Sequence, residues 1–332
     1  MMDILTSVER WPLKEPFSIS RHTFLDSLVV TATITDGEGN IGVGECEPHG
    51  WEESVALQQL DAAGALPGVA RTPSWLAGLS RENLGARMPR VQLRNAIDCA
   101  LWDLDAKRLD TRANELAGLP ADPVRVMPTI GLDTPAEMAR RAKGFTGARW
   151  LKVKLGAKDG LDPERLEAIA AALPGVPILV DPNCGWDPTT LGRMLPLAAR
   201  LGVQVIEQPM LPEFNADMPK PIGDIVFCAD ESCLDRSSLP GVRDHFQFIN
   251  IKLDKTGGLT EALALRREAE ATGMGVMVGM MSGTSLAVAP AFVLAQGLEL
   301  VDLELDYMTR DREPPMIMDG FQLLAPSPAL WG

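Results

Sequence analysis

The sequence predicts an α/β protein in which a (β/α)-barrel of parallel strands follows a smaller α+β module. From Val124 onward, apolar runs alternate with helix-like stretches, which is the pattern of repeated β/α units. Charged residues close several of these runs at intervals of about 25 residues, the length of one unit in an eight-fold barrel of about 250 residues. Eight runs have the length of a strand, at about 124–130, 149–155, 177–181, 203–207, 225–230, 246–252, 275–280 and 299–305.

The first 118 residues lack this alternation. Residues 28–34 are rich in β-branched side chains, and a turn sequence at 36–40 leads into a second run at 41–46, so a hairpin is expected. Helical stretches follow at about 52–64 and 91–117, the second with an apolar stripe at helical spacing. We therefore expect an α+β capping domain over 1–118, a barrel over 119–308, and a tail over 309–332 that packs back on the first domain.

Composition excludes several classes of protein. The 332 residues are 46% hydrophobic and 23% charged, as in an ordinary globular chain. The net charge of −14 argues against a surface for nucleic acid or an anionic membrane. Five cysteines without a Cys-x-x-Cys pair, and a first segment unlike a signal peptide, favour a cytoplasmic protein. Residues 271–298 carry no charge, but glycines and Pro290 interrupt them, so they fit the barrel interior better than a membrane span.

Three acidic residues, Asp181, Glu207 and Asp230, close successive runs, and strand ends of a barrel meet at the mouth where active sites lie. An all-oxygen set favours Mg²⁺, with Mn²⁺ as the alternative, over Zn²⁺. Acids that only cap the following helices are the competing interpretation, which suits one such residue better than three. We expect Asn183 to support a ligand or touch the substrate. Glu231 is a weaker candidate ligand, because strand alternation points it away from its neighbour.

Lysines stand on both sides of this acidic series. Lys152 and Lys154 point to the same side of one strand, and their repulsion favours loss of a proton from one of them. Downstream, Lys252 lies within the sixth strand and Lys255 just beyond it, so the two compete, and Lys255 is expected to reach over the mouth more freely. Strands two and six face each other across the barrel, as a two-base 1,1-proton transfer requires. Removal of a proton beside a carboxylate also needs a divalent metal to stabilise the enediolate.

Five motifs, taken in order, resemble the muconate-lactonizing subgroup of the enolase superfamily. They are Lys152-Val-Lys154, Asp181-Pro-Asn183, Glu207-Gln-Pro209, Ala229-Asp-Glu-Ser232 and the run from Asn250 to Gly258. The likeness extends to residues 94–103 and is greatest to the dipeptide epimerases that act on L-Ala-D/L-Glu. It implies a modified TIM barrel of the (β/α)7β type with a capping domain over its mouth. It also implies Mg²⁺ on the three acids, and acid/base roles for Lys154 and Lys255 with Lys152 assisting.

The same resemblance suggests residues that contact the substrate. Dipeptide epimerases hold the substrate's α-ammonium group with an Asp-x-Asp on the last strand, where this chain has Asp302-Leu303-Glu304, and Asp306 could replace one of these acids. Arg21 lies where the first capping loop reaches the substrate, and its expected partner is a side-chain carboxylate. Other expected lining residues are Met281 and Ser282 on the seventh-strand wall. His49 and Trp51 fall in a second capping loop, and the sequence assigns them no contact.

These features together favour a Mg²⁺-dependent epimerase that acts on the α-carbon of a dipeptide's C-terminal residue. Within the same superfamily, an N-acylamino-acid racemase (for example of N-acetyl-glutamate), an o-succinylbenzoate synthase and a cycloisomerase stay open. A Schiff-base aldolase with Lys252 or Lys255 as nucleophile is an alternative from another class. A non-catalytic binding protein is a third. The expected partner is a small molecule in every case, and a homo-oligomer is left open.

Overall fold

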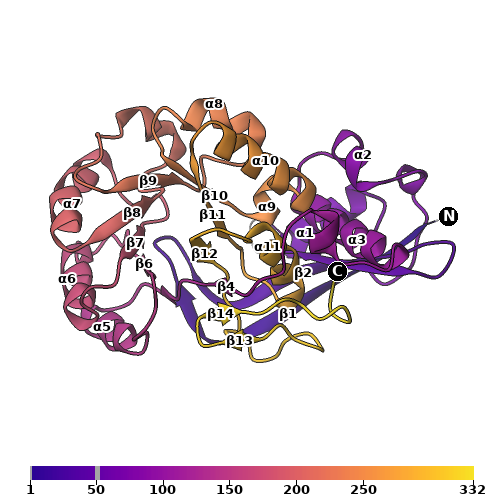
Figure 1. Ribbon diagram of the computed structural model, residues 1–332, viewed down its shortest axis with the longest axis horizontal. Helices are drawn as coiled ribbons and strands as arrows, with labels where there is room; N and C mark the ends of the chain where they lie inside the picture. Colours follow the sequence, from indigo (N-terminus) through magenta and orange to yellow (C-terminus); the bar gives the residue numbers. More distant parts are fainter. Residues whose placement is uncertain (1, 49–52) are drawn as a thin grey trace.

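The amino-terminal sheet consists of three antiparallel strands in the order β1-β2-β3, in a computed structural model that describes residues 2–48 and 53–332 (Figure 1). His49 and Trp51 lie outside the described residues. The expected hairpin is confirmed as β2 and β3. The long strand β1 was not expected, because Pro12 and Pro16 disfavour a strand interior, but β1 is an edge strand, where proline is tolerated. The strands are β1 (Asp3–Ser18), β2 (Thr23–Thr35) and β3 (Ile41–Cys46).

Helices pack beside this sheet. The helix expected over 91–117 is broken at Asp110, whose φ of 50° lies in the left-handed region, so two helices form instead of one. A further helix, at 81–87, was not expected; it is short and has no long apolar stripe. The helices are α1 (Glu53–Ala62), α2 (Arg81–Arg87), α3 (Gln92–Arg108) and α4 (Ala113–Leu116).

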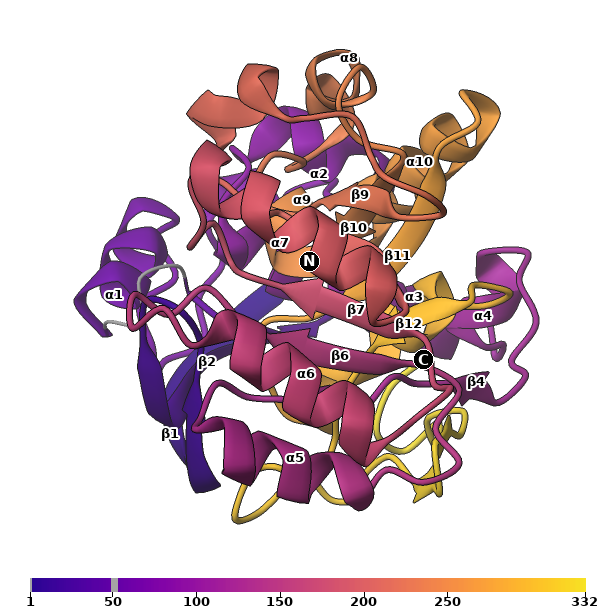
Figure 2. The same ribbon diagram turned by 90° about the vertical axis from the view of Figure 1, so that its left-hand side faces the viewer.

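The barrel contains eight parallel strands in sequential order, as expected (Figures 1 and 2). At the seam between the first and last strands, Met127 N donates to Val301 O at 2.8 Å, so the ring is nearly closed. The strands are β5 (Thr129–Ile130), β6 (Leu151–Lys154), β7 (Ile178–Asp181), β8 (Val203–Glu207), β9 (Val226–Ala229), β10 (Phe248–Ile251), β11 (Gly275–Gly279) and β12 (Leu300–Asp302).

Helical segments follow the first seven barrel strands, whereas β12 leads directly into the tail, which is the (β/α)7β arrangement. After β8 the connection is a 3₁₀ helix, η2, rather than an α-helix. The connecting helices are α5 (Pro135–Lys143), α6 (Asp162–Ala172), α7 (Pro188–Arg200), η2 (Pro212–Asp217), η3 (Arg236–Ser238) with α8 (Leu239–Val242), α9 (Leu253–Thr256) with α10 (Leu259–Ala271), and α11 (Ser285–Leu294).

The run expected as one strand over 124–130 divides in two. Only β5 joins the barrel, while β4 (Val124–Arg125) pairs with β14 (Gln322–Leu323), which pairs in turn with β13 (Met318–Asp319). The end of the tail lies against α3, where Trp331 Nε1 donates to Cys99 O at 3.0 Å and Gly332 N donates to Asp103 Oδ1 at 2.8 Å. The domain boundaries at 118/119 and 308/309 stay predictions.

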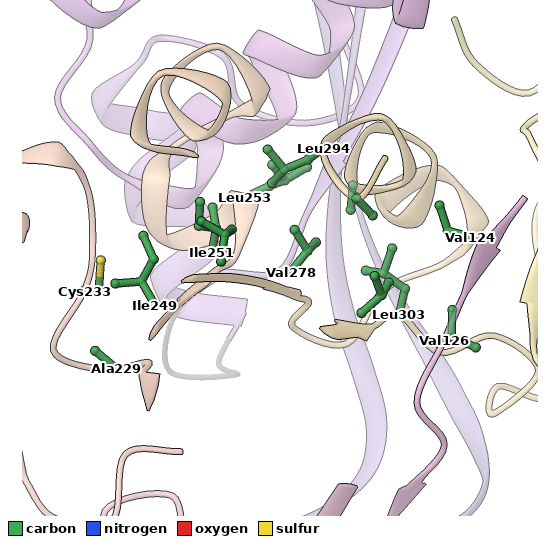
Figure 3. Packing of buried hydrophobic residues seen from close by; sticks show 14 of the residues in the cluster. Val124, Val126, Ala229, Cys233, Ile249, Ile251, Leu253, Val278, Leu294 and Leu303 are labelled. Carbon is green, nitrogen blue, oxygen red and sulfur yellow. The ribbon is translucent and has the colours of Figure 1, made fainter. Parts of the chain in front are cut away.

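Alternation along the barrel strands produces two apolar layers and one charged layer. Side chains on the outer face pack against the helices, as Ile249, Ile251 and Val278 do in Figure 3. The inward positions nearer the strand starts form a separate apolar cluster, which includes Leu179, Val205, Cys228, Met277 and Leu300. Two residues further along the same strands, the inward positions are Asp181, Glu207, Asp230, Gly279 and Asp302. The apolar cluster is therefore the floor of the site, and the charged layer is its mouth.

The uncharged stretch 271–298 contains β11 and α11, as expected for barrel interior. The helix α11 has ten residues, and most of them are buried. In the described part of the chain, every helix is too short or too polar to span a bilayer.

Close packing of β3 on α3 leads to a prediction about stability. A Cβ atom on Gly44 would lie 2.2 Å from Ala96 O and 2.7 Å from Ala100 N, so Gly44→Ala must separate the sheet from the helix. We expect it to lower the free energy of unfolding by about 1–3 kcal/mol in urea titrations. The control is Gly192→Ala in α7, where no atom lies within 4 Å and alanine should add about 0.5–1 kcal/mol. Equal stabilities of the two variants would contradict this packing.

Candidate active site

Three carboxylates lie at the ends of three neighbouring barrel strands. Asp181 ends β7, Glu207 ends β8, and Asp230 directly follows β9. All three are buried. The structure thus brings together the residues that the sequence proposed as metal ligands.

A fully buried ammonium group lies among these acids. Lys152 Nζ is 3.2 Å from Asp181 Oδ2, 2.7 Å from Glu207 Oε2 and 2.5 Å from Asp302 Oδ2, and its side chain is 0% exposed. Burial alone would lower the pKa of Lys152, but the three carboxylates outweigh it and raise the pKa well above its ordinary value. The three carboxylates therefore favour the charged form of Lys152.

The second lysine of β6 has a different environment. Lys154 is the register partner of Asp181, and its Nζ donates to Asp181 Oδ2 at 2.6 Å. Asn183 holds the other carboxylate oxygen, because its backbone N donates to Asp181 Oδ1 at 2.9 Å. Burial opposes ionisation of Asp181, but Lys154 and Lys152 together outweigh it and lower the pKa of this carboxyl to about 2. Lys154 thus lies at the mouth beside an ionised carboxylate.

On the opposite side of the barrel, Lys252 and Lys255 both contact Asp230. Lys255 Nζ donates to Asp230 Oδ1 at 2.5 Å, to Asp230 O at 2.7 Å and to Asn250 O at 2.8 Å, so all three of its hydrogens are engaged. Lys252 Nζ makes one ion pair with the described residues, at 2.6 Å from Asp230 Oδ2. Lys255, which the sequence favoured for its reach, stays a prediction, and Lys252 is the alternative with fewer contacts. Burial would lower the pKa of Lys252, but Asp230, then Glu207, outweigh it and raise the pKa above its ordinary value. Through its contacts with Asp230 and Asn250, Lys255 joins the ends of β9 and β10.

The donor set fits a hard divalent cation. Glu207 Oε2 lies close to Lys152 but accepts no hydrogen bond, and burial, then Asp181, raises the pKa of Glu207 to about 7. Asn183 Oδ1 and Asn250 Oδ1 are also buried without a hydrogen-bond partner among the described residues. No three carboxylates, imidazoles or thiols within residues 2–48 and 53–332 already form a ligand cluster. Ammonium groups lie next to the carboxylates instead, so a cation would compete with them for the same oxygens.

The acids of the last strand reach the same mouth. Asp302 accepts from Lys152 and, through Oδ1, from Thr129 Oγ1 at 3.0 Å. Glu304 Oε1 accepts from Thr129 N at 2.8 Å, and burial, then Asp302, raises the pKa of Glu304 to about 7. Asp306 does not join them, because it is 88% exposed and pairs with Lys14 of β1.

The remaining expected contacts come from two loops. Arg21, between β1 and β2, pairs with Glu231 beside the third carboxylate, with 3.1 Å between Nη2 and Oε1. Met281 and Ser282 are half-buried in the loop after β11. This loop is fixed by Glu45 of β3, which accepts from Thr284 N at 2.7 Å. The structure thus places the loop beside the capping sheet, and the roles of its side chains stay predictions.

A clamp between the capping domain and the sixth strand was not found from the sequence. Arg94 of α3 donates to Thr256 O at 2.7 Å, and Asn95 donates to Asp254 Oδ1 at 2.8 Å. Asp98 accepts from Thr260 N at 2.9 Å. These contacts hold the turn that begins at Lys252. The sequence did contain an indication of these contacts, namely polar residues inside the otherwise apolar helix at 94–103. The family resemblance covers this segment but assigns these residues no role.

Comparison with known families matches both parts of the chain. Residues 1–118 match the mandelate racemase/muconate lactonizing enzyme amino-terminal domain, and residues 134–327 match the enolase carboxy-terminal domain-like family. The chain belongs to the mandelate racemase/muconate lactonizing enzyme family. Curated members of this family are similar over nearly their whole length. An L-Ala-D/L-Glu epimerase of Escherichia coli (strain K12) is 38% identical over 93% of this chain and 95% of its own length. An N-acetyl-D-glutamate racemase of a Pseudoalteromonas species is 32% identical over 87% and 93%.

Solved structures of the family agree with this assignment. An enolase family member from Agrobacterium tumefaciens with homology to dipeptide epimerases, solved with sodium and L-Ala-L-Glu, superposes with a TM-score of 0.90. It is 39% identical, with 100% of each chain covered. A dipeptide epimerase from Cytophaga hutchinsonii, solved with Mg and D-Ala-L-Val, has a TM-score of 0.84 and 26% identity over 98% of this chain and 92% of its own. The relatives are therefore isomerases, and one similar structure carries Mg.

The clamp leads to a prediction about the pH dependence of stability. Burial, opposed by the hydrogen bonds from Asn95 and Glu47 N, raises the pKa of Asp254 from 3.8 to about 7. The folded state therefore holds this proton more tightly than the unfolded state. The contribution of this bound proton to the free energy of unfolding is lost as pH rises from about 4 to about 7, by on the order of 1.4 kcal/mol per pH unit.

In Asp254→Asn this proton is absent, so the variant should gain stability relative to the wild type across that range and level off above it. Urea unfolding between pH 4.5 and 8 measures the difference, with Asp244→Asn on the exposed surface as the matched control. A difference that is constant with pH would contradict the raised pKa.

Proposed function

We propose that this protein is a dipeptide epimerase that inverts the α-carbon of the C-terminal residue of substrates such as L-Ala-L-Glu. The observation that carries the proposal is the placement of Lys154 and Lys252. Lys154 ends β6 and Lys252 directly follows β10. Three strands separate β6 from β10 on either path around the barrel, so the two lysines face each other across the mouth. Both ammonium groups lie 2.6 Å from a carboxylate of the same central set. A substrate between them presents one face of its α-carbon to each lysine.

Each lysine moves one proton in this mechanism. In one direction, Lys154 Nζ takes the α-proton from one face while Lys252 Nζ gives a proton to the opposite face, and the reverse reaction exchanges these roles. Lys152 assists without transferring a proton, because its ammonium group is fully buried and already paired with three carboxylates. Its positive charge, within the same layer, favours the negative charge that develops on the substrate. The turn after Lys252 is held by the clamp from α3, which fixes the distance between the two bases.

Asp181, Glu207 and Asp230 would hold the metal ion, for which we propose Mg²⁺, with Mn²⁺ as an equivalent. When bound, such an ion supplies positive charge to the substrate carboxylate as the α-proton leaves, and weakens the hold of Asp181 and Asp230 on the lysines. Asn183 keeps Asp181 oriented through its backbone N–H. Asn250 does the same for Glu207, since its Nδ2 donates to Glu207 Oε1 at 2.6 Å.

An N-acylamino-acid racemase is the second candidate, and one observation favours it. Asp302 and Glu304, the acids proposed to bind the α-ammonium group of a dipeptide, already have partners in Lys152 and Thr129. An N-acyl substrate has no ammonium group and would need neither acid. Deuterium exchange at the α-carbon, followed by NMR over a set of L,L-dipeptides and N-acyl amino acids, separates the two candidates. Exchange with inversion on N-acyl substrates alone would replace the dipeptide assignment.

Removal of one lysine should leave proton exchange on only one face of the substrate's α-carbon. We expect Lys154→Ala and Lys252→Ala each to lower epimerisation by about 100-fold or more. Each variant should still exchange the α-proton of one epimer with D₂O, and the two variants should act on opposite epimers, because each keeps the base on one face. NMR in D₂O measures exchange and inversion separately.

The control for this experiment is Lys158→Ala, which removes an exposed lysine from the loop after β6 and should behave as the wild type. If Lys255→Ala exchanged the α-proton of only one epimer and Lys252→Ala kept full epimerisation, the second base would be Lys255 rather than Lys252.

Metal dependence has a readout of its own. Dialysis against EDTA should abolish epimerisation, and Mg²⁺ or Mn²⁺ should restore it. Glu207→Gln should weaken Mn²⁺ binding, measured by electron paramagnetic resonance, by about tenfold or more. The matched control is Glu213→Gln on the exposed 3₁₀ helix after β8. Unchanged Mn²⁺ affinity in Glu207→Gln would remove this residue from the ligand set.

A further inference from the structure

The contact between Arg21 and Glu231 joins the capping domain to the barrel mouth. Arg21 lies in the turn between β1 and β2, where Ile19 N donates to His22 O at 2.9 Å. The same turn touches the barrel again through Ser20, whose Oγ donates to Asn183 O at 3.2 Å. Both contacts fall beside proposed metal ligands, since Glu231 follows Asp230 and Asn183 holds Asp181. The turn therefore covers the part of the mouth between β7 and β9.

This ion pair is weakly held compared with the others at the mouth. It has a single nitrogen–oxygen contact at 3.1 Å, and the two side chains are 52% and 26% exposed. The guanidinium therefore keeps donors for a second partner, whereas a carboxylate that approached it in the fork geometry would accept two hydrogen bonds. By contrast, Lys152 is fully buried among three carboxylates. Arg21 is thus the cation of the mouth that can most easily change partners.

We propose that Glu231 is a specificity-determining residue, which neutralises Arg21 until an acidic side chain of the substrate takes its place. This inference rests on the proposed dipeptide epimerase activity. A substrate with a glutamate or aspartate side chain replaces the carboxylate of Glu231 by its own and keeps Arg21 paired. A neutral side chain gains nothing from Arg21, which stays with Glu231. Glu231 therefore lowers the affinity for acidic dipeptides alone. When a neutral dipeptide binds, Glu231 stays paired with Arg21, so the mouth contains no unpaired arginine.

The competition predicts a selective gain when the charge of Glu231 is removed. Glu231→Gln keeps the shape of the side chain but frees Arg21, so the KM for L-Ala-L-Glu should fall by roughly two- to fivefold, the effect expected of a half-exposed ion pair. The KM for L-Ala-L-Leu should not fall with it. In an Arg21→Gln background, the same substitution should lose its preference for the acidic substrate, since the cation for which the two carboxylates compete is gone.

The matched control is Glu167→Gln. Glu167 and Arg200, on the outer helices α6 and α7, form a pair with the same 3.1 Å contact but no access to the mouth, so both KM values should stay at the wild-type level. If Glu231→Gln changed both KM values equally, or changed them equally with and without Arg21, the residue would only support the metal site and the inference would fall.

A rise in the KM for L-Ala-L-Glu would also overturn it, because Glu231 would then be orienting Arg21 rather than competing for it. Each of these results leaves the epimerase assignment intact. Absence of α-proton exchange by the wild type on every dipeptide would instead overturn the proposed function, and this inference with it.

Discussion

The buried ammonium group of Lys152 is the interaction on which the rest of the mouth depends. Burial of a charge without a partner costs on the order of several kcal/mol, and the three carboxylates around this ammonium group would repel one another without a cation. Lys152 solves both problems, because it pairs with Asp181, Glu207 and Asp302 at once. Asp302 is held in addition by Thr129 of the first barrel strand. The same charge cluster therefore joins β6, β7, β8 and β12, and it helps to close the seam between the last strand and the first.

Much of this arrangement could be predicted because it depends on local periodicity. Inward and outward side chains alternate along a strand, so an acid at the end of an apolar run must face either the mouth or the helices, and three acids in register point to the mouth. Features that depend on distant partners were not visible. The strand at 124–125 could not be separated from β5, since its pairing with residues 322–323 involves the far end of the chain. The edge strand β1 was hidden by its prolines, which the sheet tolerates there because an edge strand leaves part of its backbone unpaired.

The two candidate bases, Lys252 and Lys255, differ in how many groups of the protein hold them. Lys255 does extend freely from the turn after β10, but two backbone carbonyl oxygens, of Asp230 and Asn250, lie within its range and bind it together with the carboxylate. Backbone acceptors at strand ends depend on the three-dimensional path of the chain, and no residue type signals them. The same limit applies to Asp302. Its contact with a substrate stays a prediction, and the structure shows partners within the protein that the sequence did not indicate, Lys152 and Thr129.

The two functions proposed for the mouth, proton transfer and selection among substrates, would both depend on the capping domain, but through parts of very different rigidity. The helix α3 holds the turn beside Lys252 through buried side chains that bind backbone groups, and such contacts allow little movement of this turn. The turn at Arg21 is attached by one half-exposed ion pair and one hydrogen bond, so it can exchange partners at small cost. Proton transfer needs fixed distances, whereas selection among substrates needs a contact that changes with the ligand. A single domain can meet both needs because its helix α3 is held to the barrel by several buried hydrogen bonds, whereas its turn at Arg21 is held by one ion pair and one hydrogen bond.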